Sequence, residues 1–301
     1  MLSEIAFWGA VETGLVYGLV AFGIYLSFRV LHFPDLTVDG SFPLGAAVAA
    51  ILIINGFNPW IATGAAVIAG MAAGAVTAIL NVKLNILHLL ASILTMIALY
   101  SINLRIMGQP NVALLREETV LTFWETHTAD ILPYYLVPVV LFFVVTLVVL
   151  IFLWRFMQSE AGLAMRATGT NPRMARAQGI ATGGMVILGI ALSNGLVGLA
   201  GALFAQSQGA ADVTMGVGVI VIGLASLIGG EAVLSPRTVL RALIACLIGS
   251  VLYRLAIALA LNADFIGLQA QDLNLVTAVL VTLAIVLPGA RNSIKSYFSR
   301  G

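Results

Sequence analysis

Charged residues are scarce in this sequence of 301 residues. Asp, Glu, Lys and Arg together make up 9% of it, whereas hydrophobic residues make up 61% and the mean hydropathy is +1.08. A soluble globular domain carries about 25% charged residues, so this chain cannot cover its own surface in water. Its apolar runs are continuous instead of alternating, which favours helices. The composition therefore predicts a helical integral membrane protein.

The residue types that catalytic and metal sites need are also few. The single cysteine, Cys246, lies in an apolar run and cannot form a disulfide within the chain. His32, His88 and His127 lack metal-ligand spacing. The sequence has no GxxxxGK[ST] loop, no nucleophile with a nearby base, and no basic patch interleaved with aromatic residues. We therefore expect no enzyme activity, no metal or cofactor in this chain, and no nucleic-acid partner.

Apolar segments long enough to cross a membrane, wholly or in part, are abundant. There are nine, at Trp8–Ser27, Ser41–Ile54, Ile61–Leu80, Ile86–Leu104, Ile131–Leu153, Thr182–Gln206, Met215–Gly229, Val239–Leu261 and Leu273–Leu287. A helix of about 20 residues spans the roughly 30 Å hydrocarbon core of a bilayer. We therefore predict an all-α integral membrane protein with about nine transmembrane helices, in a single transmembrane domain over residues 1–301.

The basic residues predict how these helices are oriented. If the N-terminus lies outside, eleven of the fourteen Lys and Arg residues fall at the inner ends of the segments. They are Arg29, Lys83, Arg155, Arg166, Arg173, Arg176, Arg237, Arg241, Arg291, Lys295 and Arg300. Membrane proteins retain Lys and Arg on the cytoplasmic side. We therefore expect an outer N-terminus and a cytoplasmic C-terminus.

Two of the nine segments, Ser41–Ile54 and Met215–Gly229, are too short to cross the membrane alone. Each follows a polar or helix-breaking stretch, HFPDLTVDG or QSQGAADVTMG. Non-helical backbone at membrane depth is tolerated only where protein buries it or where it lines a cavity. The two segments lie five apart in the order, so they cross in opposite directions. This pattern predicts an inverted repeat with halves of about 8–104 and 182–290.

The first broken stretch is a candidate lining of a solute path. Asp35 and Asp39 would share one face of a continuous helix and repel each other, and nearby prolines disfavour such a helix. Ser41 can cap the helix that follows. We expect Asp35, Thr37, Asp39 and Ser41 to line a polar cavity. The alternative is that both aspartates are caps, or partners of Arg29, at the cytoplasmic interface.

Three further polar residues belong to the predicted path. Gln206 and Gln208 precede the second short segment, and the stretch 206–214 is the second choice for the path. Arg254 lies in the middle of an apolar segment, where an unpaired cation costs at least about 2.5 kcal/mol. Arg254 either faces a polar cavity or forms a structural ion pair, and the residues leave both interpretations open.

The most basic polar stretch is residues 155–180, RFMQSEAGLAMRATGTNPRMARAQGI, which separates two apolar segments. Ser159 can begin a first short helix and Gly169 can end it. Asn171 can cap a second helix, with proline at its first position, and Gly179 can close it. A capped, basic, cytoplasmic helix is suited to docking another protein.

The runs GTNPRMARAQGI, FPDLTVDGSFPLGAAVAA and GVIVIGLASLIGGEAVLS resemble parts of permease subunits in bacterial ABC importers of the branched-chain amino acid and ribose type. They resemble, in turn, the coupling loop, the early broken helix and the later glycine-rich segment of that family. The resemblance covers roughly residues 8 to 290 and implies a multi-pass protein of the bacterial inner membrane. We expect the ATPase-coupling residues to be Arg166, Asn171, Pro172, Arg173, Arg176 and Gly179.

The resemblance also implies partners and a substrate class. It implies a separate cytoplasmic ATPase that hydrolyses ATP, a substrate-binding protein outside, and a second permease copy. We favour a homodimer because nothing in this chain implies a different permease, and helices with spaced glycines suit such packing. Amino acids are the first expectation for the solute, followed by sugars or nucleosides.

A secondary transporter or channel is the main alternative, because inverted repeats and broken helices occur there too. The capped basic helix discriminates between the two, since a carrier does not need it. A membrane scaffold without transport would have no reason to break two helices at membrane depth.

Overall fold

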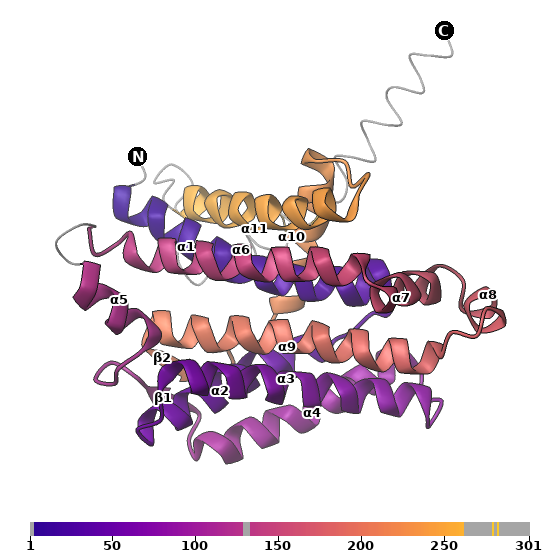
Figure 1. The fold of residues 1–301 in the computed structure, drawn as a ribbon. Helices are drawn as coiled ribbons and strands as arrows, with labels where there is room; N and C mark the ends of the chain where they lie inside the picture. The colour runs from indigo at the N-terminus through magenta and orange to yellow at the C-terminus, as the bar shows by residue number, and fades with distance from the viewer. Residues whose placement is uncertain (1–2, 129–132, 262–278, 280–281, 283–301) are drawn as a thin grey trace, which may run out of the picture.

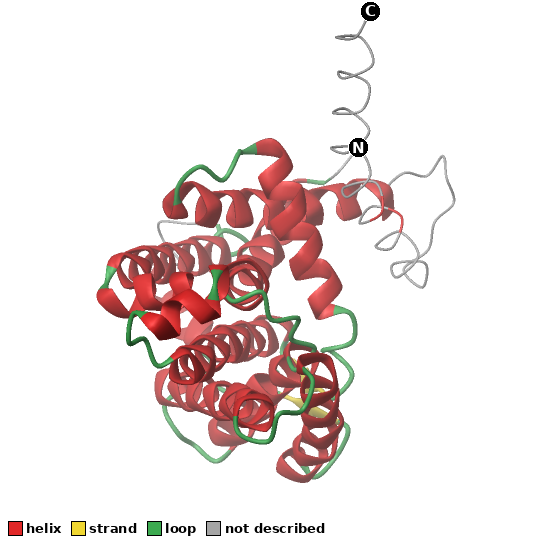
Figure 2. Ribbon diagram, turned by 90° about the vertical axis from the view of Figure 1, so that its right-hand side faces the viewer, coloured by secondary structure: helices red, strands yellow, loops and turns green. Residues whose placement is uncertain are grey.

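The computed structural model describes residues 3–128, 133–261, 279 and 282. Within them the chain forms a bundle of helices that lie side by side, with one short two-stranded ribbon at one end (Figure 1). The view turned by 90° shows many of these helices end-on (Figure 2). The elements are α1 (Glu4–Ile24), the π-helix η1 (Tyr25–Val30), α2 (Val38–Ile54), α3 (Pro59–Val82), α4 (His88–Met107), β1 (Asn111–Ala113), α5 (Val120–Thr128), α6 (Val137–Gln158), α7 (Glu160–Thr170), α8 (Pro172–Ala177), α9 (Thr182–Gln208), β2 (Ala210–Asp212), α10 (Val219–Val233) and α11 (Val239–Leu261).

The predicted membrane helices are present over the described part of the chain. Six helices are long and apolar enough to cross a membrane: α1 with η1, α3, α4, α6, α9 and α11. α2 and α10 are apolar but only 17 and 15 residues long. The helical membrane class and the two short helices are therefore confirmed. The ninth predicted segment, Leu273–Leu287, lies outside the described residues, so the number nine stays a prediction.

Local sequence explains where several helices begin and end. Asn58 caps α3, because its side-chain oxygen accepts a hydrogen bond from the backbone N–H of Trp60 at 2.9 Å. Pro59 takes the first helical position, where a missing N–H costs nothing. Gly108 and Gly209 end α4 and α9, each with a φ of +69° that glycine adopts without strain.

β1 and β2 follow the ends of α4 and α9 and pair with each other. The strands are antiparallel, with Val112 opposite Ala211. The side chain of Asn111 donates to Asp212 at 3.1 Å across the ribbon. The ribbon thus joins two helix ends that are about a hundred residues apart in the sequence.

The first short helix begins earlier than predicted. After η1 the chain is non-helical from residue 31 to residue 37, and α2 then begins at Val38. Thr37 holds the cap position, so the prediction that Ser41 caps this helix is wrong. The helix runs through Pro43, because that proline removes only the hydrogen bond to the carbonyl of Asp39, one turn earlier.

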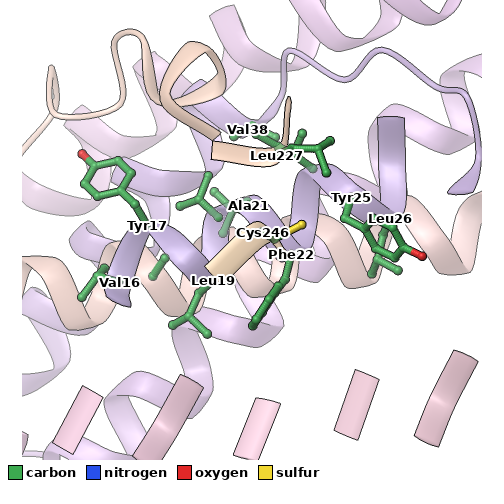
Figure 3. Close-up of a cluster of buried hydrophobic side chains, with 14 of the residues drawn as sticks. Val16, Tyr17, Leu19, Ala21, Phe22, Tyr25, Leu26, Val38, Leu227 and Cys246 are labelled. Carbon is green, nitrogen blue, oxygen red and sulfur yellow. The ribbon is translucent and has the colours of Figure 1, made fainter. Parts of the chain in front are cut away.

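α1 lies against several other helices and carries much of the core. It packs on α11, α9, α6 and α10. Phe22 of α1 and Leu26 of η1 belong to one apolar cluster with Leu227 of α10 and Cys246 of α11, as Figure 3 shows. Two pairs of long helices pack extensively: α3 on α9, and α11 on α1.

Glycine lets these helices approach backbone to backbone. A Cβ on Gly45 of α2 would lie 2.6 Å from the Cα of Gly198 in α9. A Cβ on Gly198 would lie 2.7 Å from the carbonyl oxygen of Ala66 in α3, and one on Gly14 of α1 would lie 2.8 Å from the Cα of Val251 in α11. These glycine faces are used within the chain, so they give no argument for a second copy.

We expect Gly45→Ala to lower the thermal stability of the purified protein. The added methyl group would meet the backbone of Gly198, so α2 and α9 must separate, at a cost of about 1–3 kcal/mol. Gly64→Ala is the matched control, because nothing in the described structure lies within 4 Å of its Cβ position and alanine favours a helix. Thermal unfolding in detergent measures both variants. An unchanged midpoint for Gly45→Ala would contradict the close contact.

Candidate functional site

A buried polar network holds the non-helical stretch between η1 and α2. Asp35 accepts hydrogen bonds from the backbone N–H of Thr37 at 2.9 Å and from the side-chain amide of Asn194 at 2.6 Å. The Ser41 hydroxyl donates to Oδ1 of Asn194 at 2.7 Å, and the hydroxyls of Thr37 and Thr77 lie 2.8 Å apart. None of the five side chains is more than 1% exposed. The network therefore ties the break to α9 and α3 inside the bundle.

Asp39 joins the start of α2 to the start of α10. Its carboxylate accepts hydrogen bonds from the backbone N–H of Ile220 at 2.8 Å and of Gly218 at 3.3 Å. These groups belong to the N-terminal end of α10, where the N–H groups lack partners within the helix. A negative charge is also favourable beside the positive end of a helix dipole. Asp39 therefore caps α10 from the first turn of α2.

The far end of α10 is held by an ion pair. Nε of Arg29, in η1, donates to Oε1 of Glu231 at 2.8 Å, and Nη2 donates to Oε2 at 2.5 Å. This two-point geometry is the one that arginine and a carboxylate favour. The alternative in which Asp35 and Asp39 pair with Arg29 is therefore wrong, although Asp39 is indeed a helix cap.

The two short helices consequently start at one point and run apart. α2 runs from Asp39 toward β1 and β2, with Ile53 in the apolar cluster beneath that ribbon. α10 runs the opposite way, toward Arg29. Their two N-termini meet at the half-buried Asp39.

Three of the predicted path residues do not face a cavity. Asp35, Thr37 and Ser41 are enclosed by protein and bonded within the network. Their place along a solute path stays a prediction; the structure shows them buried, because broken backbone at membrane depth needs internal partners and Asn194 supplies them. Asp39 differs, since it is only half-buried and lines a pocket.

This pocket has a volume of about 470 Å³ and lies between α2, α4 and the segment before α10. The polar residues that line it are Asp39, Tyr100, Ser101, Asn103 and Thr214. The remaining lining is mainly apolar and includes Met96 and Val217. The Thr214 hydroxyl also donates to Asp212, which lowers the pKa of that carboxyl.

Gln206 and Gln208 lie in different settings, and neither is shown to face a path. Gln206 is buried: its Oε1 accepts from the backbone N–H of Val120 at 3.0 Å, and its Nε2 donates to the Thr63 hydroxyl at 3.0 Å. Gln206 therefore fixes the start of α5 against α3 and α9. Gln208 is exposed at the last position of α9.

Arg254 stacks on an aromatic ring. Its guanidinium carbon lies 3.9 Å from the ring centroid of Tyr17 in α1, a cation–π arrangement. In the described part of the chain its Nε has no hydrogen-bond partner and no carboxylate forms an ion pair with it. The contact with Tyr17 is not the predicted ion pair, and the place of Arg254 along a path stays a prediction.

The basic stretch forms α7 and α8 at the end of the bundle opposite β1 and β2 (Figure 1). Asn171 caps α8, since its side-chain oxygen accepts from the backbone N–H groups of Arg173 and Met174, both at 3.1 Å. Pro172 holds the first helical position, and Gly179 follows the helix with a φ of +83°. The six predicted coupling residues are all exposed: Arg166, Asn171, Pro172, Arg173, Arg176 and Gly179.

Gly169 does not end α7, contrary to the prediction. The helix continues to Thr170, and a Cβ on Gly169 would meet the carbonyl oxygen of Val30 in η1. Glycine is therefore needed at this position because α7 touches the backbone of η1. The contact links α7 directly to the start of the non-helical stretch 31–37.

Several residues of this region were not predicted from the sequence. Asn194, Asn103, Thr77 and Glu231 each bind a backbone or side-chain group that holds the short helices. The available signal was an isolated polar residue within an apolar run, as with asparagine in LSNGLVG and SINLRI. Such residues usually face the interior of a bundle. No three His, Cys, Asp or Glu side chains come together to hold a metal among the described residues.

Comparison with known proteins agrees with this architecture. Residues 8–287 match the family model described as branched-chain amino acid transport system / permease component. The chain is 36% identical over 281 residues to a tyrosine transport system permease protein of Clostridioides difficile (strain R20291), covering 93% of this chain and 90% of that protein. It is 32% identical over 282 residues to an uncharacterized protein of Rickettsia prowazekii (strain Madrid E), covering 92% and 95%. No solved structure matches significantly.

The family match extends over nearly the whole chain, and the named relative is similar over nine tenths of its own length. Both are transport permeases, in keeping with the apolar helices described above. The chain therefore belongs to the family of permease components of branched-chain amino acid transport systems.

Proposed function

We propose that this chain is the membrane permease subunit of a bacterial ABC importer of the inner membrane, where it forms the path for an amino acid. The observation that carries the proposal is α8, a capped helix whose arginines are exposed at one end of a bundle of apolar helices. A transporter driven by an ion gradient has no need of such a helix. ATP would be hydrolysed by a separate cytoplasmic ATPase, and this chain would hold no cofactor.

Contacts in this structure provide a route from α8 to the broken helix. α8 follows α7 directly, and Gly169 of α7 lies against the Val30 carbonyl at the end of η1. The next seven residues are non-helical and hold Asp35, which bonds to Asn194 of α9. A displacement of α8 by an ATPase would therefore reach the point where α2 begins through contacts between backbones.

We further propose that the chain is an inverted repeat, with halves of about 8–104 and 182–290. Each of α1 and α9 is followed by a break and then by a short helix, α2 or α10. The two short helices run in opposite directions from Asp39, and α3 packs on α9 as α11 packs on α1. These paired features are expected of two halves with opposite topology.

Partners are proposed from the family and from the exposed surfaces. A substrate-binding protein would dock at the end that carries β1, β2 and α5, which is opposite α8 (Figure 1). A second copy of the chain would complete the path as a homodimer. The exposed apolar side chains of α4 outside the pocket, among them Leu90 and Leu94, offer it a surface.

The substrate is proposed to be tyrosine or a related amino acid. The relative of Clostridioides difficile is named for tyrosine transport. The principal alternative is a secondary transporter that uses the same inverted repeat. Uptake of L-tyrosine into proteoliposomes that requires the ATPase and ATP would support the importer, whereas uptake driven by an ion gradient alone would support the alternative.

The orientation can be tested by single cysteines in a Cys246→Ala background. We expect Thr126→Cys to be labelled by an impermeant maleimide in intact cells, because α5 would lie outside. Thr170→Cys should react only after the membrane is opened, because α7 and α8 would face the cytoplasm. The reverse labelling pattern would contradict the proposed orientation.

The coupling role can be tested by reversing one charge on α8. We expect Arg173→Glu to lower both ATPase binding and ATP-dependent uptake at least about tenfold, because it replaces charge-assisted contacts by repulsion. Arg241→Glu, an exposed charge reversal at the start of α11, is the matched control. Co-purification of the ATPase and uptake of L-tyrosine are the measurements. If Arg173→Glu assembles and transports as the control does, α8 is only a solvated turn.

A further inference from the structure

The pocket between α2, α4 and the segment before α10 contains a buried acceptor without a donor. Asn103 is 0% exposed, and its side-chain N–H₂ donates to the carbonyl oxygen of Gly40 at 3.2 Å. Its Oδ1 has no hydrogen-bond partner among the described residues. Buried polar atoms are nearly always hydrogen-bonded, and leaving one unpaired is costly. The Asn103 Oδ1 is therefore an acceptor that a donor group of a ligand can satisfy.

Two other polar groups of the pocket offer acceptors as well. The Asp39 carboxylate accepts two backbone N–H groups at the start of α10 and, since a carboxylate has about four lone-pair sites, it retains capacity. Thr214 directs its hydroxyl proton to Asp212, which leaves the lone pairs of that oxygen available. No Lys or Arg occurs among the described residues that line the pocket. The pocket thus matches a ligand that carries several N–H donors and a positive charge.

The rest of the lining suits an apolar or aromatic group. Met96, Ile97 and Val217 contribute apolar walls, and Tyr100 contributes a ring. The volume of about 470 Å³ falls within the range of roughly 300–1,000 Å³ that is typical of small-molecule sites. An ammonium group beside an apolar side chain is the chemistry of an amino acid.

We propose that this pocket is a solute-binding station, in which Asp39 and the Oδ1 of Asn103 accept the ammonium group of an amino acid whose apolar or aromatic side chain lies against α4. The proposal rests on the proposed transport function and deepens it by assigning the recognised group. The N-termini of α2 and α10 offset part of the Asp39 charge. This offset weakens the attraction of Asp39 for the ammonium group, and a transport path requires that the solute can leave.

Protection of a cysteine at the rim of the pocket tests this assignment. Val217→Cys is placed in the full chain with Cys246→Ala, and its alkylation by N-ethylmaleimide is timed in nanodiscs. We expect L-tyrosine and its decarboxylated analogue tyramine to slow alkylation at least about tenfold, since both carry the ammonium group. The deaminated analogue 3-(4-hydroxyphenyl)propionate should not protect. Ile68→Cys, exposed on α3 and absent from the pocket lining, is the control that should not respond to any probe.

Asn103 is tested in the same assay with two variants. Asn103→Leu removes the acceptor oxygen. The tyramine concentration that halves the alkylation rate of the Val217→Cys thiol should then rise at least about tenfold. Asn103→Asp, which keeps an acceptor oxygen, should protect nearly as well as the parent. The proposal would be overturned if the propionate protected as strongly as tyramine, or if the reagent could not reach the Val217→Cys thiol.

The parallel uptake assay separates this proposal from the proposed function. If the parent transports L-tyrosine with ATP but no probe protects the Val217→Cys thiol, the solute site lies elsewhere and the permease function stands. If protection is seen without ATP-dependent uptake, the pocket binds an amino acid and the importer function fails.

Discussion

The structure depends on hydrogen-bond partners for the backbone groups at the two helix breaks, which lie inside a bundle of membrane helices. α2 and α10 are too short to cross alone, and their first N–H groups would lie unpaired where water is excluded. Asp39 resolves this for α10, because it accepts the N–H groups of Gly218 and Ile220 while it belongs to the first turn of α2. One carboxylate thus joins two helices that start at the same depth and run apart, and it also lines the pocket.

The surrounding packing keeps this junction in place. Asn194 of α9 bonds both to Asp35 in the break and to Ser41 inside α2, so the broken segment cannot move without α9. Glycines at 45 and 198 bring α2 and α9 into backbone contact. The bidentate pair of Arg29 and Glu231 anchors the other end of α10. These contacts make the two short helices part of a rigid frame, with α7 touching that frame at Val30.

Much of this fold can be predicted from the sequence. The long-range contacts around Asp35, Asp39 and Asn103 cannot. The apolar runs, the Asn171 cap followed by Pro172, and the two short helices are local features, which hydrophobic periodicity and composition indicate. The partners of Asp35 and Asp39 lie 159 and 181 residues away, so no local pattern indicates them. Asn103 stands out in the sequence only as a polar residue within an apolar run, and the packed structure is needed to show that its side-chain oxygen has no hydrogen-bond partner among the described residues. The coupling and substrate roles stay predictions.

Amide hydrogen exchange tests the central claim, that Asp39 caps α10 across the molecule, most directly. In an Asp39→Ala variant, exchange of the backbone amides of Gly218 and Ile220 should accelerate, because these amides lose the carboxylate that accepts their hydrogen bonds while the rest of α10 keeps its helical bonds. Asp212→Ala, which removes a nearby carboxylate that bonds to Thr214 instead, should leave these two amides unchanged. Equal exchange at Gly218 and Ile220 in the parent and in Asp39→Ala would contradict the account.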